Sequence, residues 1–442
     1  MTSRADGVAH AVTSQFNKLP PKRKPTVRGN GILEWVTLSG IVAEDEDGRL
    51  TCLALATGMK CLPASKLPEA DGNGLHDWHA EILALRAFNR LLLDQCRSLA
   101  EGGVPVAQVV EWAREEALGE EALGEERALP SRPFRVKKGV RLHMYCSEAP
   151  CGDASMELTM AAQEDASPWE PRPPATAATM TEPTPEQPTM IEPTPASAEE
   201  PPLPGRAYFS RLGIVRRKPS RADAPPTASK SCSDKLALRQ CTSLLSSLTS
   251  LLVDQCYLDS LVLPASQYSA TACRRAFSTH GRMAPARAAA AAWSGGYAFR
   301  PFVVETTRHV FYLSREAVRA RAGRGISPSN IAAGWTAAGV EESIVGGVLR
   351  GRKPFHRRGA SSMSRRHMWR AASELAHLLG DGYGQLRDQL NRQTYGEVKT
   401  GPLLAVRGAV KAAARQTALA GWGGSSTKDS EFRIDDADQP AS

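Results

Sequence analysis

The 442-residue sequence contains no run of about 18 apolar residues, the length that a transmembrane helix requires. Residues 1–19 lack the apolar core and the cleavage site of a secretory signal. The nine cysteines are scattered and odd in number, which disfavours a disulfide framework and favours free thiols or metal ligands in a reducing compartment. These absences predict an intracellular protein, cytoplasmic or nuclear, without a membrane span.

Basic residues are concentrated in one part of the chain, although the formal net charge is only +8. Residues 100–206 carry 9 basic and 19 acidic groups, whereas residues 230–427 carry 27 basic and 11 acidic groups. The second block therefore has a formal charge of +16. Such a block favours a polyanionic partner, either nucleic acid or a phosphorylated small molecule.

The order of apolar and polar segments predicts one α/β domain with long insertions. With 42% hydrophobic residues, the chain can bury a sizeable core. The segment 168–204 holds 12 prolines, a composition that favours disorder. We expect a flexible lead-in over 1–31, a structured domain over 32–424 with insertions at about 100–135 and 157–229, and a disordered tail over 425–442. Strands are expected at 35–43, 50–57, 138–146, 303–312 and 342–348, and helices at 80–93, 236–256, 363–379, 385–390 and 403–420.

Two short motifs indicate metal chemistry. The sequence H-A-E at 79–81 opens an expected helix, and P-C at 150–151 follows an expected strand. H-x-E followed by P-C-x-x-C is the signature of zinc-dependent nucleobase deaminases, in which the Glu transfers protons. Here the second Cys of that pattern would fall at Ala154, which cannot bind a metal. Either there is no zinc or a third ligand comes from elsewhere, and Cys232 at a helix start is a candidate.

Four segments, in order, resemble the motifs of the RNA adenosine deaminase (editase) family. L-H-D-W-H-A-E at 75–81 resembles the family's L-H-D-x-H-A-E, and P-C-G-D-A-S at 150–155 and S-C-S-D-K at 231–235 are similar to its motifs of the same letters. T-G-M-K-C at 57–61 resembles its T-G-x-K-C segment. The M-K-C-L-P-A-S-K-L-P form looks most like the eukaryotic tRNA-specific branch, and no double-stranded-RNA-binding module is visible.

This resemblance covers residues 30–156 and 230–424 and implies a cytidine-deaminase-like core, a mixed sheet flanked by helices, with a C-terminal helical extension. The implied reaction is hydrolytic deamination of adenosine to inosine in tRNA, at the adenosine immediately 3′ of the anticodon of tRNA-Ala (adenosine 37). Alternatives are editing of other structured RNA and a catalytically inactive tRNA-binding relative. The implied site residues are the zinc ligands His79, Cys151 and Cys232 and the proton-transfer residue Glu81.

The editing relatives also bury an inositol hexakisphosphate, and a basic block suits such a ligand because buried cations need a neutralising partner. The resemblance further implies that Asp77 and Lys235 link this ligand to the zinc site. The implied contacts are Arg86, Lys235, Arg239, one of Arg365 and Arg366, Tyr395, Lys399 and Trp422.

The basic block differs from the family pattern at two positions, and it contains a basic run that the pattern does not include. Positions where the family has a further Tyr and Lys fall on Ala405 and Ala409, with Arg407 and Lys411 nearby. The run 350–370 holds eight basic residues and no acidic residue. We expect part of this run to contact tRNA phosphates, which would supply affinity but no base specificity.

Overall fold

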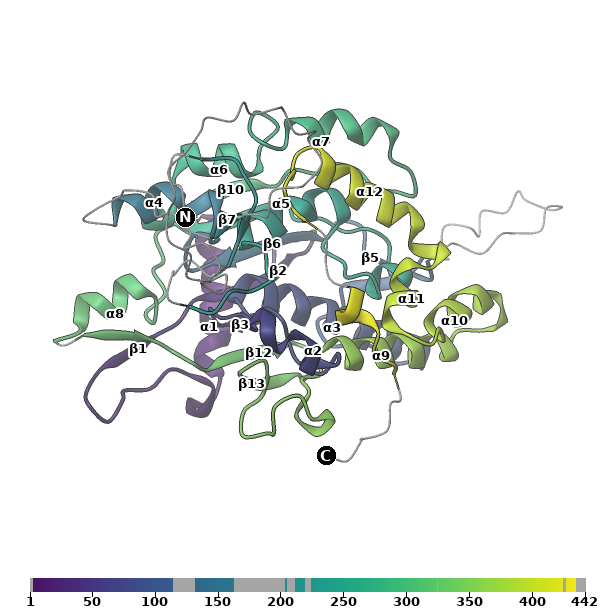
Figure 1. The fold of residues 1–442 in the computed structure, drawn as a ribbon, viewed down its shortest axis with the longest axis horizontal. Coiled ribbons are helices and arrows are strands. Elements are labelled where there is room, and N and C mark those ends of the chain that lie inside the picture. Colours follow the sequence, from purple (N-terminus) through teal and green to yellow (C-terminus); the bar gives the residue numbers. More distant parts are fainter. Residues whose placement is uncertain are drawn as a thin grey trace, which may run out of the picture.

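The computed structural model describes residues 3–113, 132–162, 203–204, 211–218, 224–323, 325–423 and 427–434. Most of the proline-rich segment 168–204, and the end of the chain after residue 434, lie outside the described residues. Figure 1 shows a mixed sheet with helices on both faces, which confirms the expected α/β class.

The central sheet is mixed. In sheet order its eight strands are β10 (Val303–Thr307), β9 (Ser260–Pro264), β6 (Arg141–Cys146), β2 (Leu38–Glu44), β3 (Leu50–Thr57), β12 (Ala332–Thr336), β13 (Glu341–Val345) and β14 (Val348–Leu349). β6, β9 and β10 run parallel to one another, and all other neighbouring pairs are antiparallel. The strand expected over 342–348 is a hairpin of β13 and β14, and β12 was not expected.

Alternating residues of the central strands face two different helices. Ile41 and Ala56 belong to the core that includes α3 (Ala80–Ala100), whereas their chain neighbours Val42 and Leu55 belong to the core that includes α1 (Arg4–Lys18). Successive strand side chains point to opposite faces of a sheet, so these strands are buried on both sides. The start of α3, which carries the H-A-E motif, is thereby held against the sheet.

The N-terminal helix α1 differs from the flexible lead-in expected over 1–31. Val8, Val12 and Phe16 are fully buried against the sheet. Residues four apart share one face of a helix, so these three side chains form a continuous apolar stripe. This spacing is present in the sequence, and burial of the stripe orders a segment that polar neighbours had suggested was flexible.

The single helix expected over 236–256 is wrong, because α5 (Cys232–Thr242) ends at Ser243, whose φ is 64°. After Ser243, the side-chain hydroxyl groups of Ser246 and Thr249 form hydrogen bonds within the same short segment. Ser246 Oγ and Thr249 Oγ1 lie 2.9 Å apart, and Thr249 N donates to Ser246 Oγ at 3.2 Å. Local side-chain hydrogen bonds of this kind compete with the helical backbone pattern.

The expected C-terminal helical extension is confirmed. It consists of α9 (Arg365–Leu378), α10 (Gly384–Leu390), α11 (Tyr395–Thr400) and α12 (Ala405–Gln416). The rings of Trp369 and Tyr395 lie 5.9 Å apart, and those of Tyr395 and Phe432 stack at 5.0 Å. Phe432 is 5% exposed, so part of the tail expected to be disordered over 425–442 packs onto this extension.

Smaller elements surround this core. They are β1 (Leu33–Trp35) paired with β11 (Ile326–Pro328), β4 (Val110–Trp112) paired with β5 (Phe134–Val136), β7 (Leu203–Pro204) paired with β8 (Arg216–Arg217), α2 (Leu67–Ala70), α4 (Met156–Ala161), α6 (Ala270–Phe277), α7 (Ala284–Ala289) and α8 (Arg315–Arg321). Among the described residues, no helix has the length and hydropathy needed to cross a bilayer.

Candidate active site

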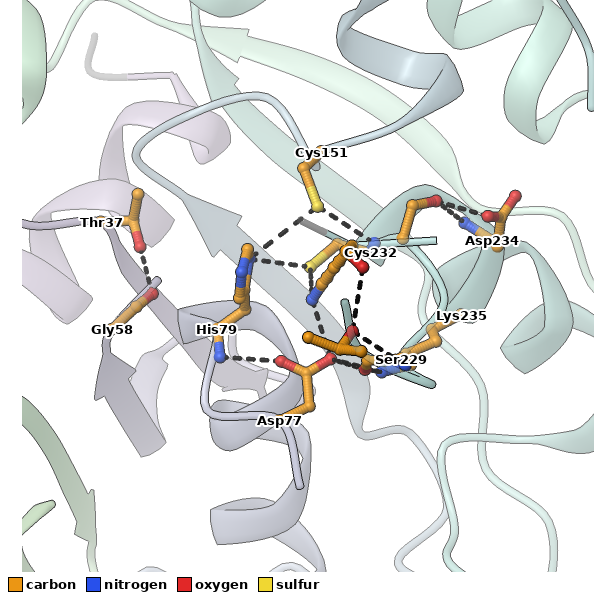
Figure 2. Close-up of polar contacts among 12 residues, drawn as sticks. Thr37, Gly58, Asp77, His79, Cys151, Ser229, Cys232, Asp234 and Lys235 are labelled. Carbon is orange, nitrogen blue, oxygen red and sulfur yellow. Dashed lines mark hydrogen bonds and ion pairs between the residues drawn. The ribbon is translucent and has the colours of Figure 1, made fainter. Parts of the chain in front are cut away.

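Three side chains that could bind a metal ion, called the metal-binding group below, meet where three elements begin or end (Figure 2). His79 caps the N-terminus of α3, Cys151 follows β6, and Cys232 is the first residue of α5. His79 Nδ1 lies 3.6 Å from Cys232 Sγ and 3.8 Å from Cys151 Sγ. A tetrahedral zinc with ordinary bond lengths holds its nitrogen and sulfur ligands about 3.6 Å apart. These residues therefore fit a zinc ion, with Cys232 in place of the missing second Cys of P-C-x-x-C.

Two glycines allow the backbone to reach this geometry. Gly58 has a φ of 138°, and a Cβ there would lie 2.2 Å from the carbonyl oxygen of Trp78. Its own carbonyl accepts a hydrogen bond from Ala80 N at 2.8 Å, which positions the start of α3. Gly152 has a φ of 102°, and a Cβ there would lie 2.3 Å from Ser231 Oγ. A side chain at either position would displace an element that carries a ligand.

Hydrogen-bond donors and positive charge surround the two thiols. Cys232 N donates to Cys151 Sγ at 3.4 Å, and Lys218 Nζ donates to Cys232 Sγ at 3.2 Å. A hydrogen bond from the Cys232 thiol and the Lys218 charge outweigh burial and hold the pKa of the Cys151 thiol well below its ordinary value, whereas burial and the same hydrogen bond raise the pKa of the Cys232 thiol well above it. Zinc binds cysteine as the thiolate, and the Lys218 ammonium group, which lowers the pKa of both thiols, favours metal binding.

Glu81 lies in the first turn of α3, two residues after His79, and is 6% exposed. Burial raises the pKa of Glu81, while the charges of His79 and Cys151 act on it in opposite directions. Its position in the first turn of the helix that His79 caps keeps the carboxyl group near the metal-binding group. No other side chain in the described part of the chain donates a hydrogen bond to it, which leaves the carboxyl group available for proton transfer.

Asp77 connects the metal-binding group to a second, cationic site. Its Oδ1 accepts a hydrogen bond from His79 N at 3.0 Å. Its Oδ2 accepts hydrogen bonds from Lys218 Nζ and Ser229 Oγ, both at 2.8 Å, and from Lys235 Nζ. Burial alone would raise the pKa of Asp77, but the Lys218 and Lys235 ammonium groups hold it well below its ordinary value. The carboxylate therefore stays charged. Figure 2 shows Asp77 between His79 on one side and Ser229 and Lys235 on the other.

Lys218 was missed by the sequence analysis. It lies within residues 157–229, which were expected to form an insertion, yet it is 4% exposed. Its backbone is fixed by hydrogen bonds with Ser229 and Thr227, and its ammonium group bridges Asp77 and Cys232. A lone lysine in a polar segment has no periodicity or motif spacing, so the single sequence contains no signal for this role.

A cavity of about 370 Å³ lies next to Asp77. Among the described residues that line it, Asp77 and Asp429 are the acidic ones. Its nine basic residues are Arg86, Lys230, Lys235, Arg239, Arg365, Lys399, Arg407, Lys411 and Arg415. So many cations around one enclosed volume are unfavourable unless an anion neutralises them.

Most of the expected polyanion contacts line this cavity. They are Arg86, Lys235, Arg239, Arg365, Tyr395, Lys399 and Trp422. Arg366 does not line it: this residue is 1% exposed and donates to Asp71 and to the carbonyls of Arg433 and Ile434. Consecutive helical residues point about 100° apart, so Arg365 and Arg366 cannot face the same cavity. Arg366 instead holds the C-terminal segment onto α9.

Helix α12 adds basic residues that the sequence analysis had not assigned to the ligand. Arg407, Lys411 and Arg415 line the cavity at spacings of four, which places them on one helix face. The family's Tyr and Lys positions, Ala405 and Ala409, are two residues earlier in each case. The spacing of four residues in the sequence already indicates that the three basic side chains share one helix face. Only the structure shows that this face of α12 lines the cavity.

The cations of the cavity are chemically suited to a polyanion. Burial and neighbouring cations lower the pKa of Arg239 to about 9, that of Lys399 to about 8 and that of Lys411 to about 7. The Nε atoms of Arg407 and Arg415 are buried without a hydrogen-bond partner. A ligand with several phosphate groups would satisfy these donors and restore the charged state.

Comparisons with known proteins agree with this geometry. The family model for the adenosine-deaminase (editase) domain matches residues 54–424. Schizosaccharomyces pombe tRNA-specific adenosine deaminase 1 is 39% identical over 310 residues, which cover 70% of this chain and 69% of that protein. The Saccharomyces cerevisiae protein of the same name is 32% identical over 58% of each chain. Mouse double-stranded RNA-specific adenosine deaminase is 27% identical over 32% of this chain and 10% of its own length.

The matched region contains all three metal-binding residues, the buried carboxyl group beside them and the basic residues of the cavity. Because the family model spans most of the chain, the chain belongs to the adenosine-deaminase (editase) domain family.

Proposed function

We propose that this chain catalyses zinc-dependent hydrolytic deamination of adenosine to inosine in tRNA. The observation that carries the proposal is the group of His79, Cys151 and Cys232 with the buried Glu81 beside it. Three protein ligands are typical of a catalytic zinc, which keeps its remaining position for water. Within the described residues, no fourth His, Cys, Asp or Glu lies close to all three ligand atoms.

The residues present have the roles that this reaction needs. Zinc in this position supplies a water activated at neutral pH. Glu81 would accept a proton from that water as it attacks C6 of adenine and pass it to N1; it would then take the proton of the new C6 hydroxyl group and pass it to the amino group, which leaves as ammonia. Because both ligand thiols must stay reduced, we also propose that the protein works in the cytoplasm or nucleus.

The substrate class is supported by the relatives and by charge. Two fungal relatives are named as tRNA-specific adenosine deaminases, and residues 230–427 have a formal charge of +16. We therefore assign tRNA as the substrate, with the adenosine 3′ of the anticodon of tRNA-Ala as the target. Glu81 is buried, so the target base must leave its stack to reach it. An inactive relative is disfavoured because Glu81 and all three ligand residues are present.

Purified protein should convert one adenosine of an unmodified tRNA-Ala transcript to inosine, detected as guanosine in cDNA. A transcript with guanosine at that position is the matched control. Conversion of double-stranded RNA but of no tRNA would favour the editing alternative. Absence of inosine in every RNA, with protein that contains stoichiometric zinc, would overturn the proposal.

We further propose that inositol hexakisphosphate occupies the cationic cavity. The ligand would be held by the basic residues that line the cavity, and Lys235 would connect it through Asp77 to Lys218 and Cys232. This chain of contacts supports a structural role for the polyanion. By pairing with Lys235, it would stabilise the charged form of this lysine and, through it, the charged forms of Asp77 and Lys218. Lys218 in turn contacts the Cys232 thiol. Removal of such supporting groups commonly costs about 10–100-fold in metal affinity or activity.

Replacing Lys399 by methionine distinguishes a filled cavity from an empty one. With the polyanion bound, the change removes a hydrogen bond to a charged group, which costs about 1.5–3 kcal/mol, and the melting temperature falls. In an empty cavity the same change removes a buried, repelled ammonium group, so the melting temperature would rise. Lys66→Met, at an exposed lysine paired with Glu69, is the control. Mass analysis of the denatured protein should detect the phosphorylated ligand in wild type.

A further inference from the structure

Two basic segments that are remote in sequence meet at the edge of the central sheet that β13 and β14 form. Lys22 lies in the short helix η1 (Pro21–Arg23), and Arg350 directly follows β14. Arg350 Nη1 donates to the carbonyl of Lys22 at 3.2 Å across a separation of 328 residues. Arg23 donates to Ser343 Oγ at 3.0 Å, which fastens η1 to β13. The tertiary structure thus joins two basic clusters into one surface.

We name this surface the edge patch and define it as Lys22, Arg350, Arg352 and Lys353. All four residues are exposed. No carboxylate of the described residues forms an ion pair with them. The two acidic residues of the neighbouring strand are engaged elsewhere: Glu341 pairs with Arg23, and Glu342 accepts hydrogen bonds from Ser361 and Ser362. The edge patch therefore presents uncompensated positive charge to solvent.

The loop that carries Arg350, Arg352 and Lys353 of the edge patch is fastened to the segment that leads into the proposed zinc site. Asn73 Nδ2 donates to the carbonyl of Phe355 at 2.9 Å, and Leu75 N donates to the carbonyl of Gly347 at 2.8 Å. Phe355 has a φ of 58°, an unfavourable conformation for a large side chain. Asn73 precedes His79 by six residues, so the attachment lies within about 20 Å of the zinc ligand.

We propose that the edge patch binds the sugar–phosphate backbone of the RNA substrate, on nucleotides that flank the reacting adenosine. This inference rests on the proposed function and names a binding surface for it. RNA is favoured over other anionic partners because hydrogen bonds hold the patch next to residues 73–79, which lead into the proposed active site. The RNA substrate has to bind at that site, whereas other anionic partners do not. Exposed Lys and Arg side chains contact phosphates irrespective of base, so the patch contributes affinity and orientation, not choice of base.

The test is a triple variant with Lys22→Gln, Arg352→Gln and Lys353→Gln. Loss of three phosphate contacts should weaken RNA binding about 10–100-fold and reduce the slope of log Kd against log salt by about 2–3. KM should rise by a similar factor, while kcat at saturating RNA stays unchanged. Binding is measured by fluorescence anisotropy with a tRNA anticodon stem-loop, in a Glu81→Gln background that prevents turnover.

Two further variants serve as controls. Arg287→Gln combined with Arg392→Gln removes exposed charge from α7 and from the turn that follows α10. Both elements lie away from β13 in Figure 1, so this variant should not change RNA affinity. The charge-preserving variant with Lys22→Arg, Arg352→Lys and Lys353→Arg should restore binding, which separates charge from folding.

Each outcome decides the inference. An unchanged Kd and salt slope in the triple variant would overturn it, as would an equal loss in the Arg287/Arg392 control. Loss of binding to phosphatidylserine vesicles with RNA binding intact would identify a membrane contact instead. Absence of inosine with wild-type protein would refute the proposed function alone, because the binding comparison does not depend on turnover.

Discussion

Replacing Glu81 by glutamine should lower the rate of deamination by about 10²–10⁴-fold, the contribution of a positioned general acid–base group. Glutamine preserves the size and the buried polar character of the side chain but cannot exchange a proton. Zinc content should stay unchanged, because the metal-binding group consists of His79, Cys151 and Cys232. The predicted result is a folded, zinc-loaded and inactive protein.

Single-turnover conversion of tRNA and metal analysis on the same preparation measure both effects. Glu101→Gln is the matched control: Glu101 follows the same helix, is exposed and pairs with Arg97. This control should keep full activity. If Glu81→Gln retains most of its rate, another group transfers the proton; if it also loses zinc, Glu81 is a ligand.

Replacing Cys232 by alanine should reduce zinc affinity by more than about 100-fold. Even the mutation of residues that only hydrogen-bond to metal ligands lowers metal affinity or activity by about 10–100-fold. The change deletes one of three ligand atoms and also leaves the buried Lys218 ammonium without its thiolate partner. Deamination should fall to background, and the melting temperature should fall because the metal no longer stabilises the folded state. Zinc content after dialysis, inosine formation and thermal unfolding are the measurements.

Cys61→Ala is the informative control for this variant. Cys61, Asp77 and His79 form a second group of potential ligand atoms that shares His79 with the first. The Asp77 carboxylate already accepts hydrogen bonds from two lysines, which favours the group with Cys151 and Cys232. Cys61→Ala should therefore keep its zinc. The reverse result, with zinc lost in Cys61→Ala and retained in Cys232→Ala, would place the metal in the second group.

The candidate metal ligands could be proposed from sequence because metal chemistry restricts residue types and short-range spacing. H-A-E at 79–81 and P-C at 150–151 were recognisable as motifs, and the structure places both beside Cys232. Most expected polyanion contacts were assigned from a family pattern, and they do line one cavity. The choice between Arg365 and Arg366 stayed open because the run of basic residues does not reveal which helix face each residue occupies; in the structure Arg365 lines the cavity.

The sequence by itself determined the α/β class, the motif residues of the candidate zinc site and the location of the basic block. Hydrophobic periodicity and ligand type are local properties, so they are readable without a structure. Only the tertiary structure decided the role of Lys218, the stripe on α12 and the joining of Lys22 to Arg350. The physical reason is that these features depend on contacts between segments far apart in sequence, whose side chains are ordinary lysines and arginines until the fold brings them together.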